Sequence, residues 1–275
     1  LEDHFTVCYW DQRGGGLSIS QEVTRESLTL EQLASDMIEV TNYLRNRFGQ
    51  EKIYIMAHSG GTVFAIRAVA ENPHLFHAYV GIAQITRQTE SEKRAWKYMF
   101  DNYSSTGNKR MADQLAKFPV TEDDSLVLPF FKSVLRDKLM HELGIGTMRN
   151  MKSIMTGVFY PVWLCRAYTI REKINIWRSK FSFVNKSGLK AEVMAVDMSE
   201  EVPALEVPAY FFSGRYDLTV NRELSEEYFN NLECPVKRFY TFENSAHSPM
   251  FEEPGRFLEI MVSDVLKGAT DISEK

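Results

Sequence analysis

Residues 52–61 read Lys-Ile-Tyr-Ile-Met-Ala-His-Ser-Gly-Gly, and this stretch decides the fold class. Its first six residues form an apolar, β-branched and aromatic run with the length of a buried strand. Two glycines follow Ser59, and residues 62–72 then predict a helix that Pro73 stops. A strand, a tight turn of small residues and a helix therefore follow one another, with Ser59 at the turn.

The neighbouring segments extend this unit in both directions. Upstream, residues 5–10 predict a buried strand, and Thr29 is placed to cap a helix that continues to Gly49. Downstream, residues 78–85 predict a third strand. Strands that alternate with helices indicate an α/β fold, with a mostly parallel sheet covered by helices on both faces.

The pattern changes after residue 85. Residues 86–205 predict helices without strand alternation, and the strand signal returns at residues 208–212 and 236–242. We therefore predict one α/β core, formed by residues 1–85 and 206–275, that is interrupted by a helical insertion at residues 86–205.

The composition excludes several classes of protein. Of the 275 residues, 44% are hydrophobic and 25% are charged, as in an ordinary globular chain. The net charge of −5 argues against a nucleic-acid partner. The three cysteines form no Cys-x-x-Cys pair, which argues against a zinc site or a disulfide framework. A reducing compartment follows, and we expect the cytoplasm, with any membrane anchor lying upstream of Leu1.

Ser59 is the first candidate catalytic residue. A nucleophile elbow has the pattern Gly-x-Ser-x-Gly between a strand and a helix, and here Ala57 takes the place of the first glycine. Such a turn exposes the serine hydroxyl at the carboxyl end of the strand, and the Gly60 N–H becomes an oxyanion donor. The alternative is a plain strand-to-helix turn with a capping serine.

Asp217 and His247 complete the candidate site. A serine hydroxyl needs a base, and in this kind of fold the order along the chain is nucleophile, acid, histidine. Asp217 and His247 follow consecutive predicted strands, so both loops lie at the sheet edge where Ser59 is expected. His247 is predicted to accept the Ser59 proton, and Asp217 to orient the imidazole. His58 is expected to pack beside the nucleophile.

These segments resemble a known superfamily. Tyr9-Trp-Asp-Gln-Arg-Gly14, the Ser59 turn, Gly214-Arg-Tyr-Asp217 and Ala246-His247 are similar to α/β-hydrolases, and more narrowly to the proline iminopeptidase branch. The resemblance implies that residues 86–205 form a cap over the active site. It also implies a His-Gly-Gly-Pro-Gly-type loop that supplies a second oxyanion donor. That motif and the first sheet strands are missing from this chain, so we expect a separate amino-terminal segment to complete the fold.

The resemblance also suggests where substrate binds. The aminopeptidases hold the free amine of their substrate with cap glutamates, one of them in a Trp-x-x-Trp-Glu-like segment. That segment is not preserved here, so Trp163 and Glu172 are taken as candidate substrate contacts. A solvated acidic face is the alternative for Glu172.

Together these features predict a serine hydrolase that cleaves an ester or amide of a small molecule or short peptide through an acyl-enzyme. An aminopeptidase of proline iminopeptidase type is favoured, with a carboxylesterase as the alternative. A non-catalytic binding protein that keeps the fold is the alternative from another class. No cofactor or metal is expected, and the sequence leaves the oligomeric state open.

Overall fold

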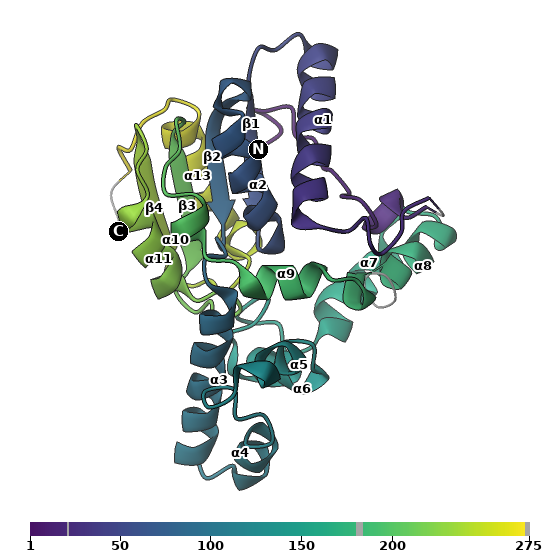
Figure 1. Cartoon of the computed structure of the whole chain (residues 1–275), viewed down its shortest axis with the longest axis vertical. Coiled ribbons are helices and arrows are strands. Elements are labelled where there is room, and N and C mark those ends of the chain that lie inside the picture. Colours follow the sequence, from purple (N-terminus) through teal and green to yellow (C-terminus); the bar gives the residue numbers. More distant parts are fainter. Residues whose placement is uncertain (21, 180–183, 273–275) are drawn as a thin grey trace.

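The computed structural model describes residues 1–20, 22–179 and 184–272. Its centre is a sheet of parallel strands in the spatial order β1-β2-β3-β4 (Figure 1). The strands are β1 (Ile53–His58), β2 (Phe76–Ile82), β3 (Ala209–Gly214) and β4 (Lys237–Phe242). Because all of them run in one direction, their carboxyl ends lie along one edge, where the loops that follow them meet.

Helices cover both faces of this sheet, as predicted. Side chains of α1 (Leu30–Phe48), α2 (Gly60–Glu71) and α11 (Arg222–Asn231) pack on one face. Those of α13 (Pro254–Ile260) pack on the other. Successive side chains of β3 point to opposite faces of the sheet, so Phe211 packs in the apolar cluster on the α1 face and Phe212 in the cluster on the α13 face.

The α1 helix has the N-cap, the buried apolar face and the C-terminal glycine that the sequence predicts. The Thr29 side chain accepts a hydrogen bond from the Gln32 backbone N–H at 3.1 Å. Leu33 and Met37 are buried against the core. Gly49 ends the helix with a φ of 62°, a left-handed conformation that glycine adopts without strain. The predicted limits of this helix are confirmed.

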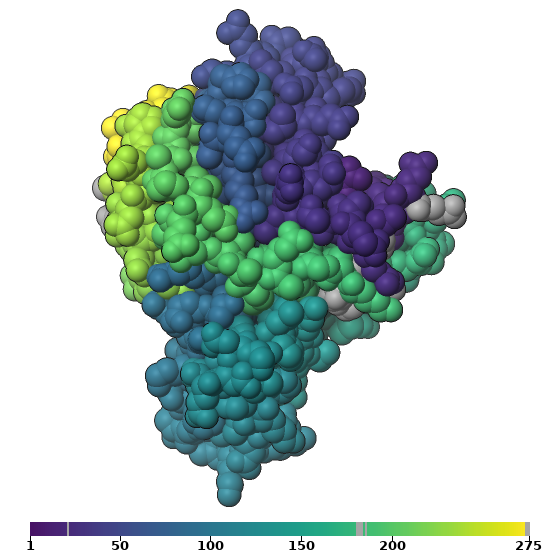
Figure 2. All heavy atoms as spheres, viewed as in Figure 1, coloured from purple at the N-terminus to yellow at the C-terminus, as the bar shows by residue number. Residues whose placement is uncertain are grey.

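Between β2 and β3, the elements in the described part of the chain are helices joined by loops. They include α3 (Gln88–Ser105), α4 (Lys109–Leu115), α5 (Val127–Phe131), α6 (Val134–Leu143), α7 (Tyr160–Leu164), α8 (Ile170–Arg178), α9 (Leu189–Ala195) and α10 (Met198–Glu201). Side chains of α3 to α6, such as Trp96, Phe130 and Leu139, form a core of their own. Figure 2 shows this part of the chain, in blue-green, as a lobe that projects from the rest of the molecule. No helix in the described residues combines the length and apolarity needed to cross a membrane.

The strand predicted at residues 5–10 is wrong. Residues 6–10 have no regular secondary structure, and the Tyr9 side chain is 86% exposed. A strand needs a partner for its backbone groups. Residues 4–10 instead line a groove of about 850 Å³, which β1 and part of α1 also line, and the Phe5 ring lies 5.6 Å from the ring of Tyr54 on β1 between centroids. High β-propensity alone therefore does not make a strand here.

Candidate active site

Ser59 lies in a strained turn between β1 and α2. Its φ of 56° and ψ of −127° are unusual for a residue with a side chain, and such backbone strain costs about 1–3 kcal/mol. Neighbouring contacts hold the turn, since the Ser59 N–H donates to the Ile82 carbonyl at 2.9 Å. A side chain built on Gly61 would place its Cβ 4.0 Å from the Ala57 Cβ. Small residues on both sides of Ser59 therefore fit this turn.

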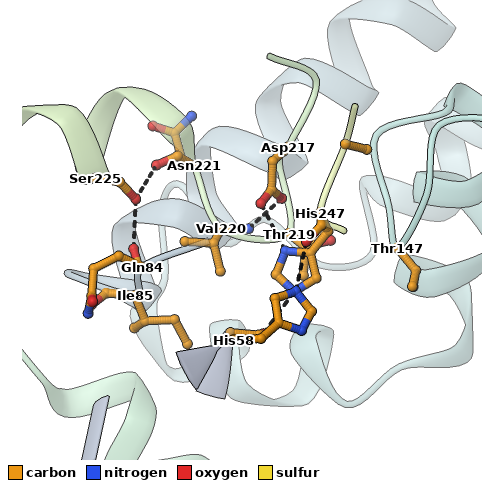
Figure 3. Close-up of polar contacts among 12 residues, drawn as sticks. His58, Gln84, Ile85, Thr147, Asp217, Thr219, Val220, Asn221, Ser225 and His247 are labelled. Carbon is orange, nitrogen blue, oxygen red and sulfur yellow. Dashed lines mark hydrogen bonds and ion pairs between the residues drawn. The ribbon is translucent and has the colours of Figure 1, made fainter. Parts of the chain in front are cut away.

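The structure brings Ser59, His247 and Asp217 together in one line of hydrogen bonds. The His247 Nε2 lies 2.8 Å from the Ser59 Oγ, and the His247 Nδ1 lies 2.8 Å from the Asp217 Oδ2. Figure 3 shows the Asp217 carboxylate directed at the His247 ring. Because an ionised carboxylate only accepts, the Nδ1 carries the proton and the Nε2 is left as the acceptor for the Ser59 hydroxyl.

Asp217, at the end of this series of hydrogen bonds opposite Ser59, is held in place by its own loop. The side chain is 1% exposed, and its second oxygen, Oδ1, accepts from the Val220 backbone N–H at 2.9 Å. Both carboxylate oxygens therefore have a donor, so the orientation of the group is fixed before any substrate arrives.

The loops that carry Asp217 and His247 pack directly on each other. A Cβ at Gly214 would lie 1.9 Å from the Ala246 carbonyl oxygen, so no larger residue fits at the end of β3. On the other side of the His247 loop, the Glu252 carboxylate accepts from the backbone N–H groups of Ala246 at 2.9 Å and of Arg149 at 2.6 Å. Burial raises the pKa of Glu252. Glu252 lies on α12 (Pro249–Glu252), and sequence reasoning missed it.

Gly60 is the first residue of α2, so the helix begins two residues before the predicted start at residue 62. The N–H groups of a helix's first turn have no acceptor within the helix, and the helix dipole makes this end favourable for negative charge. The Gly60 N–H is next to the Ser59 hydroxyl in the chain. It is therefore suited to receive an oxyanion that forms on a carbonyl attacked by Ser59.

A pocket of about 410 Å³ opens in front of Ser59. The core contributes His58, Gly60 and Phe64 to its wall. The helical insertion contributes mainly apolar side chains, which are Phe131, Val184, Leu189 and Val193, together with the polar Gln88 and Lys190. Among the described residues, no aspartate or glutamate lines it. The sequence pattern of the insertion predicted helices, but it did not identify which of their residues face Ser59.

Trp163 and Glu172, which were expected to contact substrate, do not line this pocket. Trp163 packs against Phe159 with ring centroids 5.9 Å apart. Glu172 is half-buried, and its carboxylate accepts from the Thr169 backbone N–H at 2.6 Å in a capping box at the start of α8. The Thr-x-x-Glu signature at residues 169–172 indicates this capping role.

Comparison with known proteins agrees with this geometry. The profile of the alpha/beta hydrolase fold matches residues 1–254. The chain belongs to the α/β-hydrolase family. This hydrolase is 32% identical over 267 residues to a protein of Bacillus subtilis described as a probable aminopeptidase, YbaC, and the match covers 94% of this chain and 79% of the relative. It is 24% identical to a proline iminopeptidase of Saccharolobus solfataricus, over 93% of this chain and 74% of the relative.

Solved structures have the same fold at low sequence identity. The crystal structure of VinJ matches with a TM-score of 0.61 and 17% identity, covering 94% of this chain and 80% of that one. A proline iminopeptidase of Mycobacterium smegmatis matches with a TM-score of 0.55 and 10% identity, covering 92% and 78%. An esterase of Exiguobacterium antarcticum matches with a TM-score of 0.53 and 15% identity, covering 93% and 79%. The predicted fold class is therefore confirmed.

Proposed function

We propose that this hydrolase cleaves an ester or amide bond through an acyl group carried on Ser59. The Ser59 Oγ attacks the substrate carbonyl carbon while His247 Nε2 takes the hydroxyl proton. The oxygen that becomes negative is received by the Gly60 N–H. His247 then donates the proton to the leaving alcohol or amine, and a water molecule, activated in the same way, releases the acid. The hydrogen-bonded line from Ser59 to Asp217 is the observation that carries this proposal.

An aminopeptidase is the first candidate for the natural activity. The proposal is supported by the two relatives described above, whose names are those of aminopeptidases. The pocket is also mainly apolar, which suits a prolyl or similar acyl group. In this activity the acyl group on Ser59 carries a free amine.

A carboxylesterase is the second candidate, and the pocket wall favours it. An ammonium group taken out of water needs a carboxylate partner, and the described wall contains none. A neutral acyl group does not meet this difficulty.

We also propose that an extended segment fills the groove beside β1 and supplies a second oxyanion donor. The groove lies along the free edge of β1, where backbone N–H and C=O groups can pair with another strand. His58 and Gly61, on either side of Ser59, line the groove as well. A strand added there would therefore end close to the proposed nucleophile.

A fluorophosphonate probe tests the acyl-enzyme mechanism. We expect the probe to label wild-type protein at Ser59 and to leave Ser59→Ala unlabelled. Prolyl-β-naphthylamide, N-acetylprolyl-β-naphthylamide and 4-nitrophenyl butyrate then separate the two candidates. Cleavage of the free-amine arylamide alone supports the aminopeptidase, whereas cleavage of the butyrate ester with neither arylamide supports the esterase. A protein that takes no label and cleaves none of these substrates would indicate a binding protein.

A further inference from the structure

The position of the His247 ring depends on contacts of its backbone, because both ring nitrogens already form hydrogen bonds. Its two ring nitrogens are used by Asp217 and Ser59, so the length of those bonds depends on where the backbone holds the ring. The His247 N–H donates to the Gly146 carbonyl at 3.3 Å, which is a long hydrogen bond. The His247 carbonyl accepts a much shorter one, 2.7 Å, from the Nε2 of His58.

His58 meets His247 in two ways. Besides the bond to its carbonyl, the two rings lie 4.7 Å apart between centroids at an angle of 45°. Figure 3 shows the His58 ring directly beside that of His247. His58 is also the last residue of β1 and the chain neighbour of Ser59. One strand end therefore fixes the serine through the peptide bond and the histidine through a side chain.

The chemistry of this contact fixes the state of His58. A carbonyl oxygen only accepts, so the Nε2 must carry the proton. Burial lowers the pKa of His58 to about 3, so the ring is neutral near pH 7. A neutral ring does not oppose the positive charge that His247 gains when it takes a proton. With its Nε2 engaged, His58 has no role as a proton carrier in this geometry.

We propose that His58 is a positioning residue, which holds the His247 backbone at the distance from Ser59 that proton transfer requires. This inference rests on the proposed acyl-enzyme function. Displacements of about 1 Å at a reacting group can cost on the order of 10²-fold in rate, so one short hydrogen bond at this place has a large effect.

Two variants separate the hydrogen bond from the packing of the ring. His58→Phe keeps an aromatic ring beside His247 but loses the donor. His58→Gln loses the ring but places an amide N–H near the position of Nε2. We expect His58→Phe to slow both fluorophosphonate labelling and kcat for 4-nitrophenyl butyrate by about 10- to 100-fold. KM should change less than about threefold, because a phenyl ring replaces an imidazole ring of similar size in the pocket wall. His58→Gln should stay within about fivefold of wild type. His74→Phe, a change of an exposed histidine that lines neither the pocket nor the groove, serves as the control.

Equal impairment of the Phe and Gln variants would assign the role to packing and overturn the proposal, as would an unchanged rate in His58→Phe. Nitrogen-15 NMR of the histidine rings gives a readout that does not need activity. The Nε2-protonated tautomer of His58 is expected in wild-type protein, and an Nδ1-protonated ring would also overturn the proposal. If wild-type protein takes no label and hydrolyses no ester, the proposed function fails, while the tautomer still decides whether His58 holds the His247 carbonyl.

Discussion

Asp217 makes two hydrogen bonds that an amide cannot replace together. One oxygen faces the His247 Nδ1 and the other faces the Val220 N–H, and both of these partners are donors. In Asp217→Asn the NH2 group must face one of them. If it faces His247, the imidazole is held in the tautomer that cannot accept the Ser59 proton; if it faces Val220, two donors oppose each other.

We therefore expect Asp217→Asn to lower kcat for an ester substrate by about 10³- to 10⁴-fold. Stopped assays with 4-nitrophenyl butyrate measure this, and thermal unfolding checks that the variant is folded. A folded variant with more than a tenth of the wild-type kcat would contradict the role given to Asp217.

His58 also predicts how stability depends on pH. Its pKa is about 3 in the folded chain and near the ordinary 6.5 in the unfolded chain, so the unfolded chain binds the proton more readily. The stabilising contribution is full above pH 6.5 and is lost as the pH falls toward 3, by about 1.4 kcal/mol for each pH unit. His58→Gln lacks this titration. Urea unfolding at pH 7, 6 and 5 should show the free energies of unfolding of wild type and variant converging, and a constant difference would contradict the prediction.

At the scale of elements, the end of β3 and the His247 loop are locked by one glycine. A methyl group on Gly214 would overlap the Ala246 carbonyl, so Gly214→Ala must push the loop away from β3. We expect fluorophosphonate labelling of Ser59 to slow by at least about 10-fold, because displacement of His247 breaks its alignment with Ser59. Gly255→Ala is the matched control, since nothing lies within 4 Å of a Cβ there. Equal labelling rates in Gly214→Ala and Gly255→Ala would contradict this prediction, because the loop would then accommodate the methyl group without displacing His247.

In the helical insertion, a buried ion pair links α3 and α6. The Arg136 Nε donates to Glu92 at 2.8 Å, and the two side chains are 6% and 0% exposed. Removing one partner leaves a buried, unpaired charge, so Arg136→Met should lower the free energy of unfolding by about 3–5 kcal/mol. The double variant Glu92→Leu with Arg136→Met should recover most of that loss. Urea unfolding measures both, and a double variant as unstable as the single one would contradict this account.

Local rules in the sequence predicted most of the fold and the arrangement of the site. The strands, the capped α1 helix and the turn at Ser59 follow from patterns within a few residues. Parallel strands bring their carboxyl ends together, so the proximity of Ser59, Asp217 and His247 also followed from chain order. These predictions succeeded because backbone geometry, more than the packing of particular side chains, determines them.

The predictions that failed depend on distant partners. Residues 5–10 have the composition of a strand, but they form one only if a neighbouring strand offers backbone hydrogen bonds. Glu172 was assigned to substrate from resemblance, whereas its own neighbour Thr169 uses it as a helix cap. No rule of spacing relates Glu252 to the Ala246 and Arg149 backbones, which meet only in the folded chain.

For the whole molecule, the edge of β1 that pairs with no described strand is a surface suited to association with another strand. Figure 1 places β1 at the border of the sheet, and the groove beside it is lined by apolar side chains such as Phe5, Leu44 and Met56. Met56 is 39% exposed. Exposed edges and apolar grooves of this kind favour association with another strand.

When no extended segment fills the groove, we therefore expect the 275-residue chain to self-associate as its concentration rises. Met56→Lys should weaken this association at least about threefold. A lysine places a charge on the groove wall and raises the cost of excluding water there. Val134→Lys, at an 84% exposed position on α6, is the matched control and should associate like wild type. Sedimentation velocity over a concentration series measures the effect. Equal association of all three proteins would show that the β1 edge is not the surface through which copies of the chain meet.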